Sequence, residues 1–362
     1  MYAEAQEARR GLEAARRTLG EIFGCRPQDI VVTSGGSESD NLALRGVAHA
    51  ARAQGRGDHV ITTAIEHHAV LHEAERLEQE GFRVTYLGVD GEGFIDLEEL
   101  EEAVTDETVL VSVMYVNNEV GTIQPLEEAV PLVKAKNPRT AFHTDAVQAA
   151  GRLDLDVDKL GVGLLSIAAH KFYGPKGVGA LYVRPRTAVQ WQQLGGSQEK
   201  NRRAGTENVA GVVGTATALE LAHSEVESGN AHCRALRDKL IAGVPERVPG
   251  VHLTGPADLS RRASHNASFC FEGIEGDAIL IALDLAGVAA SSGSACTSGS
   301  MDPSHVLSAM GIPLDLARGS MRLTVGKDNT TDQIDYVLDV LPEIVSRVRG
   351  LSPTSVERTE GA

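Results

Sequence analysis

A lysine and an acid that each follow an apolar run are the residues of this chain best placed to do chemistry. Asp145 comes soon after Thr140-Ala141-Phe142, and Lys171 comes soon after the apolar run 164–169 and before a Gly-Pro-Lys-Gly turn. Short apolar runs of this kind predict buried strands of a parallel sheet. Open α/β sheets bind their ligands at the carboxyl ends of the strands, so we expect both charged groups at that edge.

A lysine and an acid in this arrangement suit pyridoxal phosphate. The lysine would hold the aldehyde as a Schiff base, and the acid would keep the pyridine nitrogen protonated so that the ring accepts electrons. Taken alone, the same pair is also typical of an ordinary ion pair at a sheet edge.

A phosphate site is indicated where the strand 30–33 runs into Ser-Gly-Gly-Ser-Glu-Ser-Asp at 34–40 and then into a helix. Gly36 and Ser37 would open that helix, whose free N–H groups and positive dipole end favour an anion. The alternative is that Ser37 with Asp40 only caps the helix.

Three further polar residues follow or interrupt predicted strands. His67 opens a helix after the strand 59–63 and suits ring stacking or proton transfer, although taken alone it is more typical of a surface histidine. Asn118 follows the strand 108–115 and suits a pocket wall or a plain turn. Arg322 lies inside the apolar run 321–325, where a buried guanidinium needs a partner such as a substrate carboxylate.

One cysteine stands out among the four in the chain, Cys25, Cys233, Cys270 and Cys296. They are scattered, without Cys-x-x-Cys spacing, so neither a disulfide framework nor a zinc site is indicated. Most unpaired cysteines are buried small hydrophobes. Cys296, however, lies in a run of Ser, Gly and Ala at 289–300. An exposed thiol on such a loop is a candidate nucleophile.

Composition limits the classes of function. The 362 residues carry a formal net charge of −16 and are 42% hydrophobic. This charge argues against direct binding to nucleic acid or to an anionic membrane. No apolar run is long enough to span a bilayer and no signal core precedes the first helix, so we expect a cytoplasmic protein.

The order of elements predicts an α/β protein with a mainly parallel, doubly wound sheet. After a first amphipathic helix at 2–23, strands and helices alternate as far as the strand 180–183. We expect a large domain over 1–228, a smaller α/β domain over 229–350 that carries the cysteine loop, and a disordered tail over 351–362. The polar, glycine-rich stretch 195–208 is too long for a simple connector and suggests binding or subunit contact.

Together these motifs closely resemble the cysteine desulfurases, which belong to the fold-type I pyridoxal phosphate enzymes (class V). The matching stretches occur in family order over nearly the whole chain: 33–41, Glu66-His67, 116–121, 145–148, His170-Lys171 and 292–298. The long cysteine loop followed by Asp-Pro-Ser-His-Val-Leu at 302–307 resembles the housekeeping group, which supplies iron–sulfur assembly and tRNA thiolation.

The resemblance implies a role for each matching residue. Lys171 would form the Schiff base and move the proton, with Asp145 on the pyridine nitrogen and Gln148 on the ring oxygen. His67 would stack on the ring, and Asn118 and Arg322 would hold substrate. The phosphate would be bound by Gly36, Ser37 and His170, with Thr206 reaching the phosphate of a neighbouring subunit. Cys296 would accept sulfur from L-cysteine as a persulfide and pass it to an iron–sulfur scaffold or another acceptor. It could also ligate a partner's metal cluster, and no metal of the protein's own is implied.

The sequence departs from the family pattern at three places. Ser37 stands where threonine is common, Ala168 stands where a serine usually binds the phosphate, and the Ala-Thr-Thr-Pro type of segment that lines the substrate pocket is absent from the front. We expect a homodimeric cysteine desulfurase. The alternatives are a related selenocysteine lyase, an aminotransferase-like enzyme, or a non-catalytic scaffold that keeps the cofactor.

Overall fold

The computed structural model describes residues 2–292 and 304–351 and divides into two compact units. The first unit comprises residues 1–88, 95–116 and 124–226, and the second comprises 89–94, 117–123 and 227–362. The second unit thus takes in two short segments that a single boundary after residue 228 assigns to the first domain. None of the helices in the described part of the chain is long and apolar enough to cross a membrane.

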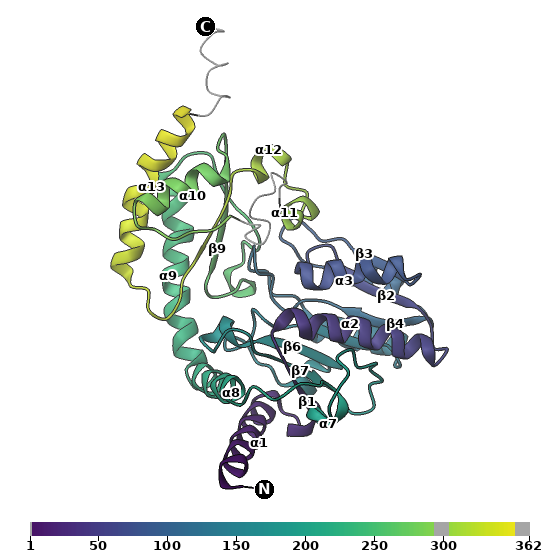
Figure 1. Ribbon diagram of the computed structural model, residues 1–362. Helices are drawn as coiled ribbons and strands as arrows, with labels where there is room; N and C mark the ends of the chain where they lie inside the picture. Colours follow the sequence, from purple (N-terminus) through teal and green to yellow (C-terminus); the bar gives the residue numbers. More distant parts are fainter. Residues whose placement is uncertain (1, 293–303, 352–362) are drawn as a thin grey trace. The chain divides into compact units, whose positions relative to one another are not determined.

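The first unit is built on a seven-stranded sheet in the order β1-β7-β6-β5-β4-β2-β3 (Figure 1). The strands are β1 (Ile30–Thr33), β2 (His59–Thr63), β3 (Arg83–Leu87), β4 (Thr108–Ser112), β5 (Ala141–Asp145), β6 (Leu164–Ala168) and β7 (Gly179–Val183). The β3-β2, β2-β4, β4-β5 and β5-β6 pairs are parallel. The predicted mainly parallel sheet is therefore confirmed.

One strand, β7, runs against its neighbours. It pairs antiparallel with β6 on one side and with β1 on the other. The chain between β6 and β7 holds only the 3₁₀ turn η2 (Ala169–Phe172) and the Gly-Pro-Lys-Gly turn. A parallel return needs a crossover of a dozen or more residues, so this short connection makes the reversal necessary.

The helices of the first unit pack on its sheet or on one another. They are α1 (Ala3–Phe23), α2 (Gly36–Ala53), α3 (His68–Gln79), α4 (Leu97–Ala103), α5 (Leu126–Lys136), α6 (Val157–Leu160), α7 (Gln198–Asn201) and α8 (Val209–Ser224), with the 3₁₀ turn η1 (Pro27–Asp29). Figure 1 shows α2 lying over the sheet, where it contacts β4, β5, β6 and β7. Its apolar stripe, including Leu44 and Val47, packs with Leu110 and Leu164 in one core, and these four side chains have no exposed surface. Burial of this stripe fixes α2, and with it the turn that precedes α2, against the strand ends.

The second unit has a three-stranded antiparallel sheet in the order β10-β9-β8. Its elements are α9 (Val226–Arg247), β8 (Val251–Leu253), η3 (Leu259–Arg261), β9 (Asn266–Phe271), α10 (Gly276–Leu285), α11 (His305–Ala309), α12 (Leu314–Ala317), β10 (Ser320–Thr324) and α13 (Thr331–Leu351). Phe269, Phe271, Leu283, Met321 and Leu341 are fully buried in its core. The second unit therefore has a hydrophobic core of its own.

Candidate functional site

Lys171 lies on the short connection that follows β6. The turn η2 begins directly after the last residue of β6, and the N–H of Gly174 donates to the carbonyl of Ala169 at 2.9 Å. Tyr173 adopts a left-handed conformation with φ of 65°, which ends the turn. The side chains of His170 and Lys171 are thus presented from the carboxyl end of a buried strand, and both residues are exposed.

Asp145 is the last residue of β5, the strand next to β6, and it is 6% exposed. Its carboxylate accepts from the N–H of Val147 at 2.8 Å. Burial raises the pKa of Asp145 to about 6, while the N–H of Val147 and the positive charge of Lys171 hold it down. The structure thus brings the acid and the lysine to adjacent strand ends within the first unit, with Asp145 largely ionised at neutral pH.

His143, two residues before Asp145 on β5, belongs to a cluster of buried polar side chains. The ring of His143 is within hydrogen-bond distance of Ser112 Oγ at 2.8 Å from Nδ1 and of Ser166 Oγ at 2.9 Å from Nε2. Its Nε2 also lies 3.6 Å from Oδ1 of Asp40. Burial lowers the pKa of His143 to about 3, so the ring is neutral. Burial and the charge of Asp145 raise the pKa of Asp40 well above its ordinary value.

Asp40 lies next to His143 in the core and not at the helix cap that its sequence position suggested. The N-cap of α2 is Gly35, no side chain caps this helix, and Asp40 is 1% exposed on the side of α2 that faces the sheet. The interpretation of Ser37 with Asp40 as a helix cap is wrong. Asp40 and His143 are members of the site that sequence reasoning missed, although the apolar flanks of His143 at 141–145 place it inside a buried strand.

The start of α2 has the features of an anion site. Its first turn carries Gly36 and Ser37, with no side-chain cap on the N-terminal N–H groups. A Cβ on Gly36 would lie 3.5 Å from Cβ of Ala168, so the helix start and the end of β6 adjoin. A Cβ on Gly179 would lie 2.7 Å from the Gly35 backbone. Only glycine allows this close packing, which leaves the turn open for a phosphate.

His67 is the N-cap of α3, and its Nδ1 accepts from the N–H of Ala69 at 3.1 Å. An accepting Nδ1 assigns the ring proton of a neutral imidazole to Nε2. The neighbouring Glu66 is fully buried, and its Oε1 accepts from Met114 N–H at 2.8 Å and Thr63 Oγ at 2.9 Å. Burial raises the pKa of Glu66 to about 8. His67 is thus held at the β2 strand end beside a protonated acid.

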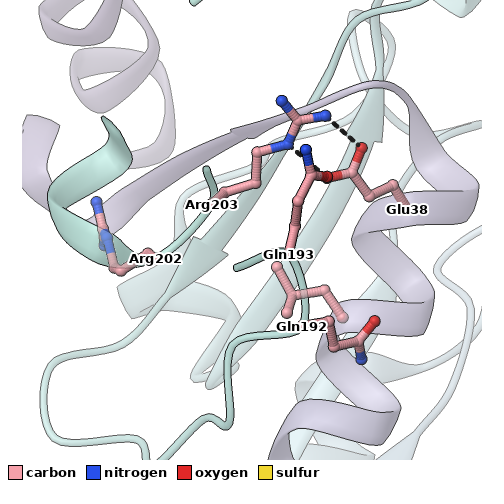
Figure 2. A pocket seen from close by; sticks show the side chains of 6 residues that line it. Glu38, Gln192, Gln193, Arg202 and Arg203 are labelled. Atoms are coloured by element: carbon pink, nitrogen blue, oxygen red, sulfur yellow. Dashed lines mark hydrogen bonds and ion pairs between the residues drawn. The ribbon is translucent and has the colours of Figure 1, made fainter. Parts of the chain in front are cut away.

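A pocket of about 300 Å³ lies between α2 and the glycine-rich stretch in the first unit. It is lined by Glu38, Leu42, Gln192, Gln193, Arg202 and Arg203. Figure 2 shows Arg203 reaching the carboxylate of Glu38, with nitrogen–oxygen distances of 2.9 and 3.1 Å. This bidentate pair ties the glycine-rich stretch to the first turn of α2. Thr206, three residues beyond Arg203, is exposed, and Gln148 is half-buried.

Two predicted site residues, Asn118 and Arg322, belong to the second unit. Arg322 Nη1 donates to the carbonyl oxygen of Asn118 at 2.6 Å, and Nη2 donates to Ser291 Oγ at 2.9 Å. The structure therefore joins these two residues to each other.

Cys296 lies outside the described residues. Among the cysteines that are described, burial raises the pKa of Cys25 and of Cys270 to about 12 in each case, and Cys233 is 2% exposed. A thiol with so high a pKa is a poor nucleophile at neutral pH. Within 2–292 and 304–351, no group of three or more His, Cys, Asp or Glu residues could hold a metal ion.

Comparison with known proteins adds an independent line of argument. Residues 1–337 match the aminotransferase class-V family. The chain is 50% identical to a cysteine desulfurase IscS of Clostridium botulinum, over 98% of this chain and 88% of the relative. It is 48% identical to the cysteine desulfurase IscS of Dictyoglomus turgidum, over 97% of this chain and 88% of the relative.

Solved structures agree in fold. A NifS-like protein superposes with a TM-score of 0.88 at 38% identity, covering 95% of this chain and 90% of its own. A structure described as SspA in complex with cysteine superposes with a TM-score of 0.78 at 33% identity, covering 91% of this chain and 90% of its own.

Proposed function

The chain belongs to the class-V aminotransferase family and is a cysteine desulfurase that serves iron–sulfur cluster biosynthesis, and from this premise we propose which residues carry the reaction. Lys171, Asp145 and Cys296 are the central three, with pyridoxal phosphate as the cofactor. The observation that carries the proposal is the placement of Asp145 and Lys171 at adjacent strand ends, where each charge acts on the other.

The donor set of the first unit fits pyridoxal phosphate. The N-terminal N–H groups of α2, with Gly36, Ser37 and His170, would hold the phosphate, and Thr206 of a second copy would add a contact. Asp145 would hold the ring nitrogen, Gln148 the ring oxygen, and His67 would cover the ring face. When bound, this cofactor withdraws electrons from the amino acid attached to it.

Lys171 has two tasks in this proposal: its amine holds the cofactor, and afterwards it moves a proton at the substrate carbons. Its exposed position on η2 suits both tasks, because the side chain is not packed in the core. Asp145 stays ionised at neutral pH because its pKa is about 6, so the ring nitrogen would meet a carboxylate. Asp145 is only 6% exposed, and this burial would strengthen its interaction with the ring nitrogen.

Cys296 would take the sulfur as a thiolate. Its attack on the sulfur of L-cysteine forms a sulfur–sulfur bond and breaks the bond between that sulfur and the substrate β-carbon. The electron pair of the broken bond stays on the carbon, which takes up a proton, so that L-alanine leaves and a persulfide remains on Cys296. Asn118 and Arg322 would hold the substrate, with the guanidinium of Arg322 on its carboxylate.

We further propose that the protein works as a homodimer in the cytoplasm, passing its sulfur to an iron–sulfur scaffold or another acceptor, including one for tRNA thiolation. The scattered cysteines, without disulfide spacing, suit a reducing compartment. The structure described as SspA in complex with cysteine supports L-cysteine as the substrate.

Two variants with matched controls test these assignments. Lys171→Ala should remove the visible absorbance of the lysine-bound cofactor, whereas Lys176→Ala on the same exposed connection should keep it. Cys296→Ala should keep the absorbance and stop persulfide formation, whereas Cys25→Ala should keep the absorbance and still form the persulfide. An unchanged spectrum in Lys171→Ala, or sustained sulfur release in Cys296→Ala, would refute the corresponding role.

A further inference from the structure

Two consecutive residues of the second unit, Asn118 and Glu119, bind two segments that lie far along the chain. Arg322 links Asn118 to Ser291 through its two Nη atoms, at 2.6 and 2.9 Å. The backbones of Ser291 and Arg322 also exchange two hydrogen bonds, at 2.7 and 3.2 Å. Ser291 is thereby held to β10 and, through the guanidinium, to Asn118.

Glu119 makes the second link. Its Oε2 accepts from Ser304 Oγ at 2.5 Å, and the residue is only 4% exposed. Ser304 is the N-cap of α11, because its Oγ accepts from the N–H of Leu307 at 3.2 Å. A buried carboxyl that accepts from a hydroxyl makes a short, strong hydrogen bond. Glu119 therefore binds the residue that caps α11.

The backbone that carries Glu119 is itself firmly held. Asn117 Oδ1 accepts from the N–H of Glu119 at 2.8 Å and from that of Val120 at 3.0 Å. Asn266 Nδ2 donates to the carbonyl of Glu119 at 3.0 Å. Three separate bonds thus fix the main chain on which the Glu119 carboxyl is mounted, so this carboxyl is a rigid anchor and not a surface group that happens to meet Ser304.

Ser291 and Ser304 stand on either side of Cys296 in the sequence. We propose that Glu119 is a positioning residue for sulfur transfer, whose carboxylate fixes Ser304 while Arg322 fixes Ser291, so that one short segment sets both ends of the stretch that carries Cys296. The inference deepens the proposed function and rests on the role of Cys296 as sulfur acceptor.

The charge of Glu119 gives this proposal a pH signature. Burial raises the pKa of Glu119 to about 7, and the Ser304 hydroxyl and the positive charge of Arg322 hold it down. These are the groups that face it from the start of α11 and from β10, with the neutral Asn266 on β9. The ionised carboxylate accepts a stronger hydrogen bond than the neutral acid does, so the hold on Ser304 tightens as the pH rises through 7.

The experiment compares Glu119→Gln and Ser304→Ala with the wild-type holoenzyme, and uses Ser308→Ala as the control. Ser308 Oγ donates to the carbonyl of Ser304 and makes no bond to Glu119, so the control repeats the serine exchange on the same helix. Glu119→Gln keeps the shape and an acceptor oxygen but cannot ionise. Two quantities are measured: hydrogen exchange of the α11 amides, and the rate at which Cys296 gains one sulfur atom from L-cysteine, followed by protein mass.

At pH 8, we expect the α11 amides of Glu119→Gln and Ser304→Ala to exchange about tenfold faster than those of wild type and Ser308→Ala. The rate at which Cys296 gains its first sulfur atom should be about tenfold lower in the same two variants. The amplitude of the cofactor's spectral response to L-cysteine should stay unchanged, because Asn118 and Arg322, which would hold the substrate, keep their own hydrogen bond in both variants. The ratio of the wild-type rate to the Glu119→Gln rate should fall toward one at pH 6. Ionisation of Cys296 is common to both proteins and cancels in that ratio.

The proposal is overturned if Glu119→Gln forms the persulfide at the wild-type rate at pH 8, if α11 exchange is unchanged, or if the rate ratio does not vary with pH. Loss of the spectral response would also overturn it, since Glu119 would then act on substrate binding. A wild-type enzyme that makes alanine without a persulfide on Cys296 would refute the sulfur-acceptor role, and with it this inference.

Discussion

Replacing Glu66 by glutamine should make the protein more stable at neutral and alkaline pH. Glu66 has no exposed surface, and its Oε1 accepts from Met114 N–H and Thr63 Oγ. A glutamine oxygen can accept the same two bonds, so Glu66→Gln keeps the local geometry and removes only the ability to ionise. The change therefore isolates how much the raised pKa of Glu66 lowers the free energy of unfolding.

The magnitude follows from the pKa of Glu66, which burial raises from 4.5 to about 8. Between these values the folded protein keeps a proton that the unfolded chain releases. The free energy of unfolding of the wild type therefore falls as the pH rises, by about 1.4 kcal/mol per pH unit from this group alone. From pH 5 to pH 7.5 we expect Glu66→Gln to gain about 2 to 3 kcal/mol relative to wild type.

Urea unfolding of both proteins at pH 5 and pH 7.5 measures this gain, with exposed Glu102→Gln as the control for the exchange itself. The control should show the same difference from wild type at both pH values. A Glu66→Gln variant whose difference from wild type is also independent of pH would contradict the protonated state of Glu66.

Three more outcomes can be measured. Burial lowers the pKa of His143 from 6.5 to about 3, so between these pH values the unfolded chain binds a proton that the folded protein does not bind, and the free energy of unfolding falls on acidification. In urea unfolding, His143→Gln should therefore lose less stability than wild type from pH 6.5 to pH 4. An equal loss would count against a neutral His143. Gly179→Ala places a Cβ 2.6 Å from the Ile167 carbonyl oxygen and 2.7 Å from the Gly35 backbone. We therefore expect the protein to lose about 1 to 3 kcal/mol of stability and to bind the cofactor more weakly in an equilibrium titration. Wild-type affinity would show that this packing does not hold the turn. Iodoacetamide at pH 7.5 should label Cys25 and Cys270 much more slowly than Cys296, as followed by peptide mass, because the first two have pKa values of about 12; equal labelling would contradict their burial.

Much of the frame was predictable because it depends on local patterns. The buried runs before Asp145 and Lys171 have the length and residue types of parallel strands. β5 and β6 are indeed parallel, so both charged groups follow strands at the same edge of the sheet, as expected. The reversal of β7 follows from the shortness of its connection, which the sequence displays but periodicity does not encode.

The buried acids could not be predicted, because their positions depend on long-range packing. Asp40 has the sequence position of a helix-cap partner, yet it faces the sheet and interacts with Ser166 on β6. Glu119 lies in what looks like a plain turn, and its partner Ser304 is 185 residues away. Local propensity carries no information on such pairs, so only the folded chain identifies them.

The most direct test of the central claim is single-turnover reaction of the purified holoenzyme with L-cysteine in the absence of reductant. We predict one alanine released per cofactor, together with a gain of one sulfur atom on Cys296, and continued alanine release once a thiol reductant is added. Cofactor absorbance without alanine in either condition would contradict desulfurase activity.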